Sequence, residues 1–126
     1  MSVLKSMALV SVNVTNWEQA KHFYGQVLGL PVVFADDKMG WVQYGPADGV
    51  NLAINWWRGP EPVPPQNGGG TVVFNVDDAF EAVKTLRALG VKCNDAYVVP
   101  DMVTVADFYD PEGNHMQIAG PAPKSK

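Results

Sequence analysis

Hydrophobic and polar residues alternate over residues 8–14, which predicts a β-strand with one apolar face. The spacing then changes over residues 17–28, where apolar residues recur every three or four positions, as in an amphipathic helix. Thr15 or Asn16 is expected to cap this helix, and Gly29 to end it. Three further strands are predicted, over residues 31–35, 40–44 and 50–56.

The same order of elements recurs in the second half of the chain. An alternating segment over residues 71–76 predicts a strand, and Asp77 or Asp78 is expected to cap a helix that Gly90 ends. The segment 110–114, DPEGN, is a strong hairpin signal. The remaining strands are predicted over residues 92–99, 102–109 and 115–119. The chain thus contains an internal duplication of element order with weak residue identity.

This duplication predicts an α+β fold in which two tandem βαβββ modules form a curved mixed sheet around a cavity, with the helices on the outer face. Each sheet buries one apolar face against its helix, so we expect the other face to line a cavity. The 126 residues, 47% of them hydrophobic, suffice for one core and not for two independent ones. We therefore expect one domain over residues 1–126, with modules at about 7–57 and 71–120 and a Pro- and Gly-rich linker at about 58–70.

The amino-acid composition argues against nucleic acid and membrane as binding partners. The net charge of −4 and the sequence pI of about 4.9 argue against a protein that binds nucleic acid through clustered Lys and Arg. No apolar segment reaches the length of a membrane helix, and the N-terminal residues do not have the layout of a signal peptide. Cys93 is the single cysteine, so no internal disulfide is possible, and a buried inert thiol is its expected role. We expect a cytoplasmic protein that contacts neither membrane nor nucleic acid.

Three segments resemble the markers of one protein family. The residues 22–30, HFYGQVLGL, resemble the first-helix signature of the glyoxalase, bleomycin resistance and extradiol dioxygenase group, the vicinal oxygen chelate superfamily. The residues 76–78, VDD, and the turn 110–114 are similar to markers of that group's second half. The resemblance covers roughly residues 7–120 and implies the duplicated fold. It does not imply one activity, because a scaffold of this kind hosts many.

Members of this family usually depend on a divalent metal held by His, Gln or Glu on the first and last strands of each module. The resemblance places those positions at Leu9, Ala53, Thr71 and Gln117. Leu and Ala side chains have no donor atom, Thr is a poor ligand, and one neutral amide does not hold a divalent ion. A register shift by one residue would present Val10, Leu52, Val72 and Met116 instead, which is no better. We expect no metal and no other cofactor, which argues against metal-dependent lyase, isomerase, thiol transferase and dioxygenase activities.

Alternation assigns a polar set of residues to the concave face of the predicted sheet. Its members are Leu9, Ser11, Asn13, Asn51, Ala53, Asn55, Thr71, Val73, Asn75, His115 and Gln117. Neutral amides and hydroxyls are costly to bury unpaired, so this set predicts a wet or ligand-filled cavity. Trp41 and Trp57 are candidates for stacking on a planar ligand, with packing in the core or at a dimer interface as the other interpretation.

Residues for catalysis are few. Asp107 either points into the cavity, as a buried base or as an anion for a cationic ligand, or is a solvated residue of an edge strand. His115 shares a strand face with Gln117, where it forms a polar wall of the cavity, lies at its rim or joins Gln117 in a water network. No Ser lies in a strand–turn–helix elbow, and no catalytic residue is assigned.

Three classes of function follow. The first is a ligand-binding protein that sequesters a small aromatic or polar drug or metabolite, as in the bleomycin-resistance branch, and confers antibiotic resistance. The alternative is a metal-independent or atypical enzyme, related to lyases, isomerases or dioxygenases, that acts on a small metabolite through His115, Asp107 or Gln117. A partner-binding module without a small ligand is the third. The resemblance implies a homodimer, and the predicted linker permits modules paired within one chain or swapped between two.

Overall fold

The computed structural model describes residues 7–63 and 71–123, and these two segments belong to two compact units, which we call unit 1 and unit 2. Unit 1 contains β1 (Leu9–Val14), α1 (Trp17–Lys21), the π-helix η1 (His22–Val27), β2 (Val32–Asp36), β3 (Trp41–Tyr44) and β4 (Asn51–Trp56). Unit 2 contains β5 (Val72–Asn75), α2 (Ala79–Ala88), β6 (Lys92–Cys93), β7 (Tyr97–Val99), β8 (Val103–Tyr109) and β9 (His115–Gly120). The α+β class and the repeated order of strand, helix and strands are confirmed.

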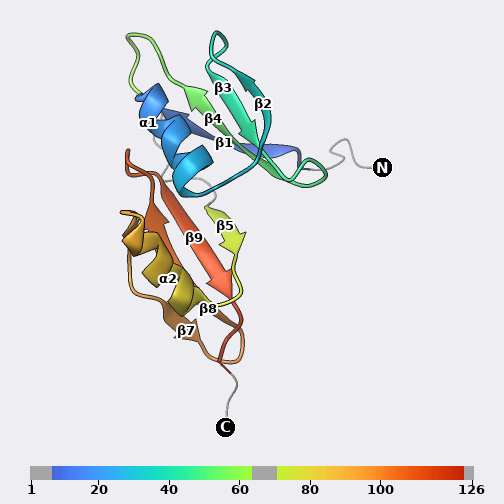
Figure 1. Ribbon diagram of the computed structural model, residues 1–126, viewed down its shortest axis with the longest axis vertical. Helices are drawn as coiled ribbons and strands as arrows, with labels where there is room; N and C mark the ends of the chain where they lie inside the picture. The colour runs from blue at the N-terminus through green and yellow to red at the C-terminus, as the bar shows by residue number, and fades with distance from the viewer. Residues whose placement is uncertain (1–6, 64–70, 124–126) are drawn as a thin grey trace. The chain divides into compact units, whose positions relative to one another are not determined.

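The sheet of unit 1 has the strand order β1-β4-β3-β2 (Figure 1). β1 and β4 are parallel, and the other neighbours are antiparallel. The helical segment between β1 and β2 packs on one face of this sheet, because alternate strand residues present apolar side chains there. Val14, Tyr24 and Ile54 are fully buried in this core.

The first helix differs from the continuous amphipathic helix that the spacing predicts. After α1 the chain widens into a π-helix, in which the Leu28 N–H donates to the Phe23 carbonyl five residues earlier at 2.9 Å. Tertiary packing explains the difference. Phe23 and Tyr24 are consecutive in sequence and both are buried, and Gly25 leaves room where it faces the Tyr44 ring.

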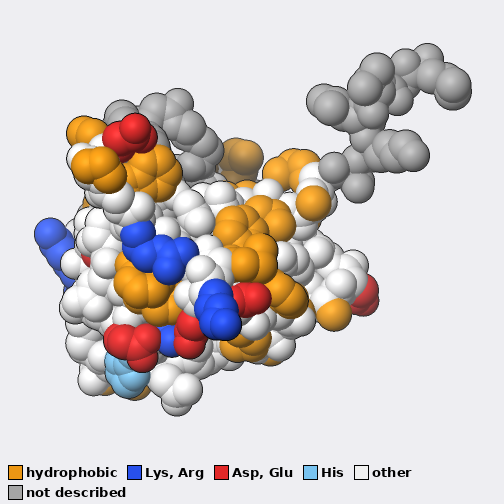
Figure 2. Space-filling view, turned by 90° about the horizontal axis from the view of Figure 1, so that it is seen from above, with side chains coloured by type: hydrophobic (Ala, Val, Ile, Leu, Met, Phe, Trp, Pro, Cys, Tyr) orange, Lys and Arg blue, Asp and Glu red, His pale blue; other side chains and the backbone are white. Residues whose placement is uncertain are grey.

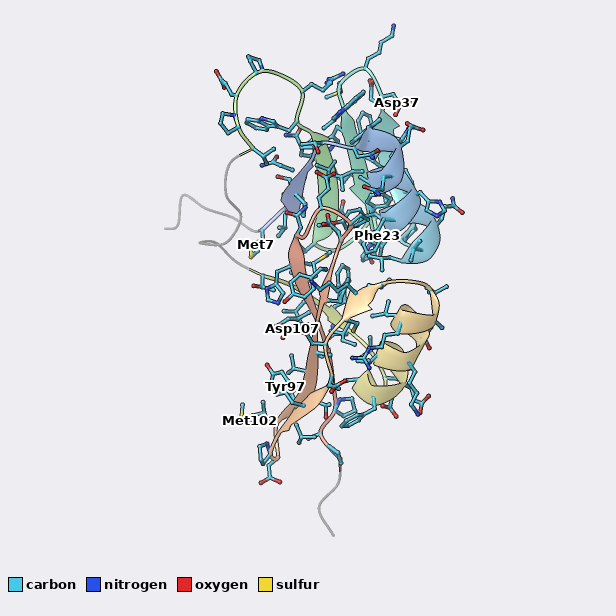
Figure 3. All side chains as sticks on the ribbon, turned by 90° about the vertical axis from the view of Figure 1, so that its left-hand side faces the viewer. Met7, Phe23, Asp37, Tyr97, Met102 and Asp107 are labelled. Carbon is cyan, nitrogen blue, oxygen red and sulfur yellow. The ribbon has the colours of Figure 1, made fainter. Side chains whose placement is uncertain are left out.

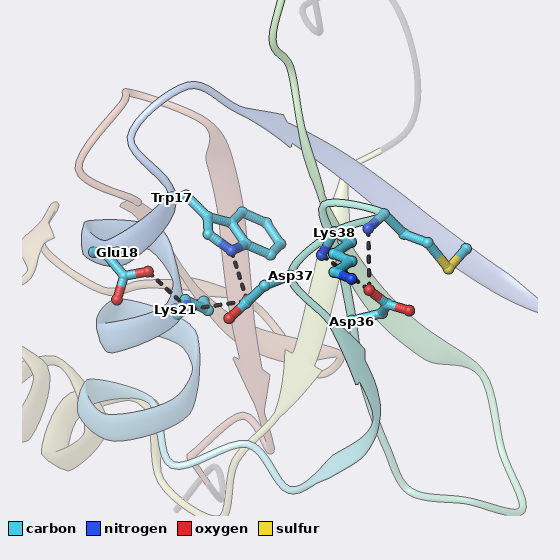
Figure 4. Close-up of polar contacts among 7 residues, drawn as sticks. Trp17, Glu18, Lys21, Asp36, Asp37 and Lys38 are labelled. Carbon is cyan, nitrogen blue, oxygen red and sulfur yellow. Dashed lines mark hydrogen bonds and ion pairs between the residues drawn. The ribbon is translucent and has the colours of Figure 1, made fainter.

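Polar contacts fix the start of this helix to the β2–β3 turn. Asn16, one of the two predicted caps, accepts a hydrogen bond from the Gln19 N–H at 3.2 Å. The Asp37 carboxylate accepts hydrogen bonds from the Trp17 indole at 2.9 Å and from Lys21 at 3.0 Å (Figure 4). Trp17 is buried and stacks on Trp56 at 5.4 Å between ring centroids.

The sheet of unit 2 has the order β5-β9-β8-β6, and β7 also pairs with β8. α2 lies across one face of this sheet (Figure 1), and Asp78 caps it by accepting from the Glu81 N–H at 3.2 Å. The prediction of one strand over 92–99 is wrong, because it divides into β6 and β7 with residues 94–96 between them. Arg87 of α2 holds this break through the Cys93 carbonyl at 2.8 Å and the Asp95 carboxylate at 2.8 Å.

The hydrogen-bonded strands form two sheets, one in each unit. The enclosed cavity and the single-domain organisation remain predictions. Residues 64–70 of the predicted linker lie outside the described residues. No helix among the described residues is long and apolar enough to cross a membrane.

Candidate functional site

The face of the unit 1 sheet away from the helix carries the predicted polar residues. The parallel register of β1 and β4 pairs Leu9 with Asn51, Ser11 with Ala53 and Asn13 with Asn55. These residues therefore share one face, while their sequence neighbours Val12 and Ile54 are buried on the other.

An amide network runs across this face. The Gln43 amide of β3 donates to the Asn51 side-chain oxygen at 2.6 Å, and Asn51 donates in turn to the carbonyls of Pro46 and Gly49. The Asn55 amide donates to the Asn13 side-chain oxygen at 3.1 Å. Asn51 is buried and satisfied within the protein, so its role is to fix Gln43 and the turn that precedes β4.

Indole rings flank the Asn13–Asn55 pair. Trp41 is directly opposite Asn55 in the β3–β4 pairing, and its indole donates to the Gln43 side-chain oxygen at 3.3 Å. Trp57 follows Asn55 by two residues, and its indole donates to the Glu61 carbonyl at 2.9 Å. Both rings are half-buried, so each combines an anchored N–H with exposed aromatic surface.

The corresponding face of unit 2 combines exposed and half-buried residues. Thr71, Val73 and Asn75 are exposed, and Val73 is paired with Gln117 of β9. Gln117 is also paired with Asp107 of β8. Asp107 lies on the side of the sheet away from α2 (Figure 3), and its neighbours Ala106 and Phe108 are buried.

Asp107 joins His115 and Gln117 in a cluster that we call the unit 2 polar cluster. Its Oδ1 accepts hydrogen bonds from His115 Nε2 at 2.7 Å and from Gln117 Nε2 at 2.9 Å. The interpretation of Asp107 as a solvated residue of an edge strand is wrong. β8 is an interior strand with β9 on one side and β6 and β7 on the other, which leaves 23% of the Asp107 side chain exposed.

The contacts of Asp107 favour its ionised form. The Gln117 amide and the His115 ring donate to the carboxylate, and they hold the pKa of Asp107 below its ordinary value against the opposing effect of burial. A folded-state pKa below the unfolded one makes ionisation of Asp107 a stabilising event. That stabilisation is present above the unfolded pKa of about 3.9 and is lost as the pH falls through the lower folded-state value.

The Asp107→Asn variant tests this linkage. We expect it to unfold at lower urea concentration than the wild type at pH 7, and the difference to shrink as the pH is lowered below about 4. Urea denaturation at several pH values measures both curves. Asp95→Asn is the matched control, because the Asp95 side chain is 91% exposed in a surface ion pair. If the wild type were more stable than Asp107→Asn by the same amount at every pH, the prediction would be contradicted.

The family's usual metal does not fit these residues. Leu9 and Ala53 present hydrocarbon side chains on the unit 1 face, and the Gln117 amide is engaged by Asp107. Among residues 7–63 and 71–123, no group of three or more His, Cys, Asp or Glu side chains is placed to hold a metal ion. The donor chemistry of the four family positions therefore gives no basis for a metal-dependent step.

Cys93 is buried, as predicted, and desolvation raises the pKa of its thiol. A thiol with a raised pKa is a poor nucleophile at neutral pH. Surface charge also agrees with the composition. On the face shown in Figure 2, Lys and Arg side chains lie beside Asp and Glu, with no extended basic patch among the described residues.

Sequence reasoning missed three residues on these faces. Gln43 lies between Trp41 and Asn51, and alternation along 40–44 was a sufficient signal for it. Tyr109 is opposite His115, with ring centroids 5.4 Å apart. Tyr97 is half exposed and opposite Val105, a pairing that no local pattern reveals because β7 begins after an irregular break.

Comparison with known proteins gives one family and several similar structures. The family model described as Glyoxalase/Bleomycin resistance protein/Dioxygenase superfamily matches residues 6–118. No curated protein matches the chain.

Three solved structures illustrate the similarity. TnmS3, an antibiotic binding protein from Streptomyces sp. CB03234, has 24% identity and a TM-score of 0.77, over 97% of this chain and 100% of that one. A glyoxalase/bleomycin resistance protein from the same source has 26% identity and a TM-score of 0.69, over 90% and 98%. Lactoylglutathione lyase from Agrobacterium tumefaciens has 18% identity and a TM-score of 0.69, over 94% and 96%. The fold thus occurs in a binding protein and in an enzyme.

Proposed function

The chain belongs to the glyoxalase/bleomycin resistance protein/dioxygenase superfamily, and on this premise we propose that it binds and sequesters a small organic molecule without a bound metal. The ligand is aromatic or polar, and the polar sheet face of each unit offers groups that bind such a molecule. An antibiotic is one candidate, since TnmS3 is an antibiotic binding protein, and resistance would then follow from sequestration.

The observation that carries the proposal is the amide and indole surface of unit 1. Asn13 and Asn55 are bonded to each other and half-buried, with the Trp41 ring opposite Asn55. Side-chain amides offer both donors and acceptors, and an indole face stacks on a planar group. Such a surface recognises a planar molecule with polar edges.

A ligand panel tests the proposal. Planar antibiotics, carboxylate metabolites and thiol metabolites are added to the full-length protein, with and without chelator, and the melting temperature is recorded. A ligand that binds only the folded state raises it by mass action. We expect at least one planar compound to raise the melting temperature, and we expect the chelator to leave this rise unchanged. A panel without any rise, or a rise that the chelator abolishes, would overturn the proposal.

Trp41→Leu is expected to weaken binding of a planar hit about five- to tenfold, because stacking on an aromatic ring contributes roughly 1 kcal/mol beyond burial. Tryptophan fluorescence quenching measures the affinity. Phe80→Leu is the control, since Phe80 is a 44% exposed aromatic residue of α2 on neither polar face. Equal losses in both variants would show that Trp41 makes no specific contact.

A second candidate function rests on the unit 2 polar cluster. An Asp carboxylate that orients a His ring, here with 34% of the His115 side chain exposed, is an arrangement that acid–base enzymes use. In that case the protein is a metal-independent enzyme acting on a small metabolite. Turnover of carbonyl metabolites followed by NMR, with loss of turnover in His115→Gln, would favour this candidate over sequestration.

We also propose a cytoplasmic homodimer. β2 is an edge strand of the unit 1 sheet and exposes Val32 by 55% and Phe34 by 47%, and an uncovered apolar edge favours pairing with another chain. Phe34→Lys is expected to weaken the dimer at least tenfold, since it places a charge in the apolar edge. Size-exclusion chromatography with light scattering measures the mass. A wild-type monomer at all concentrations would contradict the prediction.

A further inference from the structure

The hydrogen bonds of Asp107 determine which nitrogen of His115 carries the proton. An ionised carboxylate only accepts hydrogen bonds, and Asp107 Oδ1 lies 2.7 Å from His115 Nε2. Nε2 must therefore bear the hydrogen. The neutral ring then carries its lone pair on Nδ1, since a neutral imidazole has one donor and one acceptor nitrogen.

The side chain that carries this acceptor nitrogen is partly exposed. The His115 side chain is 34% exposed, and within residues 7–63 and 71–123 its ring makes no hydrogen bond besides that to Asp107. The Tyr109 ring packs beside the His115 ring, with 5.4 Å between the ring centroids and 32° between the ring planes. An aromatic wall next to an acceptor nitrogen suits a ligand that presents a donor on a flat, unsaturated frame.

The charges around His115 select among donors. Lys92 of β6 lies with its ammonium 5.4 Å from the centre of the Tyr109 ring, so a cation already occupies the Tyr109 end of this face. The Asp107 carboxylate is shared by two internal donors. Thr71 and Val73, from β5, carry no charge. The proton of an acidic hydroxyl would face the His115 lone pair, and the hydroxyl oxygen would be stabilised by the Lys92 cation.

We propose that the unit 2 polar cluster is a recognition site for a phenol or enol, whose hydroxyl donates to Nδ1 of His115. The inference rests on the proposed small-molecule binding and names the chemical class of the ligand. Asp107 is a positioning residue in this site, because it acts through His115, and Gln117 holds Asp107 from the other strand.

The tautomer is measured first, on the wild-type protein. Long-range proton–nitrogen NMR correlates the ring protons of each histidine with both ring nitrogens. The chain contains two histidines, so His22→Gln assigns the signals. We expect the neutral His115 ring to be protonated at Nε2, and the Asp107→Ala variant, which has no acceptor at this position, to populate the other tautomer as well. Protonation of the wild-type ring at Nδ1 would overturn the proposal without any question of variant stability.

The ligand class is tested with a matched pair of probes. Phenol carries the hydroxyl, and anisole has the same ring with a methyl ether in its place. We expect phenol to bind about five- to tenfold more tightly, as one good hydrogen bond provides, and this preference to fall in Asp107→Ala but persist in Asp95→Ala. Titrations followed by the His115 signals measure both affinities.

The outcomes separate this inference from the proposed function. Equal affinity for both probes, no binding of either, or tighter binding of benzylammonium than of the phenol would overturn phenol recognition alone, provided that the ligand panel contains a hit. A panel without hits together with no probe binding would overturn both.

Discussion

Gly40→Ala is expected to destabilise the protein by about 2–4 kcal/mol, the sum of backbone strain and a steric clash. Gly40 has a φ of 71°, a left-handed conformation that costs a residue with a side chain roughly 1–2 kcal/mol. A Cβ at this position would also lie 2.8 Å from the Cβ of Trp56 and 3.0 Å from Nη2 of Arg58. Trp56 has little freedom to move, because its ring is stacked on Trp17.

Gly29→Ala separates the two contributions. Gly29 has nearly the same φ, 70°, but no atom lies within 4 Å of the position that its Cβ would occupy. We therefore expect a loss of only about 1 kcal/mol, from the backbone alone. Urea denaturation of both variants gives the difference. Equal losses would mean that the Trp17–Trp56 stack yields to the new methyl group and is not the rigid element that the packing indicates.

Asp110→Ala is expected to destabilise unit 2 by about 3 kcal/mol, because it removes the acceptor of several backbone and side-chain donors. Asp110 is 5% exposed. Its carboxylate accepts from the N–H groups of Glu112 at 2.9 Å and Asn114 at 2.8 Å, and from the Asn114 side chain at 2.8 Å. These contacts close the turn between β8 and β9, and without them these donors lose the carboxylate acceptor.

Asp110→Asn keeps one acceptor oxygen, so we expect it to lower the free energy of unfolding by about half as much as Asp110→Ala does. Asp95→Ala, a substitution on the surface, should change the free energy of unfolding by less than about 0.5 kcal/mol. Thermal and urea unfolding measure the series. The turn also sets the register that places His115 opposite Tyr109 and Gln117 opposite Asp107, so Asp110→Ala should alter the NMR signals of His115. Unchanged signals and unchanged stability would contradict a role for this turn in holding the site.

Much of the fold was predictable because its signals are local. The alternation of residues 8–14 placed Asn13 and Ser11 on the face opposite Val12, and the pairing of β1 with β4 confirms it. Asn16 and Asp78 cap their helices as their positions before the first helical turn predict. Each of these features depends on the geometry of a few consecutive residues, so a single segment of sequence contains the information.

The sequence predicted which residues belong to the candidate site, but not which of them contact one another. Asn13, Asn55, His115 and Gln117 follow from strand periodicity, but their partners come from other strands. The bond between Gln43 and Asn51 and the bond between Asp107 and His115 depend on which strands become neighbours and in which register. Because β8 is an interior strand of the sheet, Asp107 lies at the centre of a hydrogen-bonded cluster and not at a solvated edge.

The sequence by itself determined the elements, their caps and turns, and which side chains share a strand face. The tertiary structure alone decided that the first helix widens at Phe23 and Tyr24, that the segment after Gly90 divides at residues 94–96, and which polar groups meet. The physical reason is the range of the interactions. Caps and periodicity act within about one turn or one strand, whereas packing, pairing and hydrogen bonding join residues distant in sequence and become favourable only when the whole core assembles.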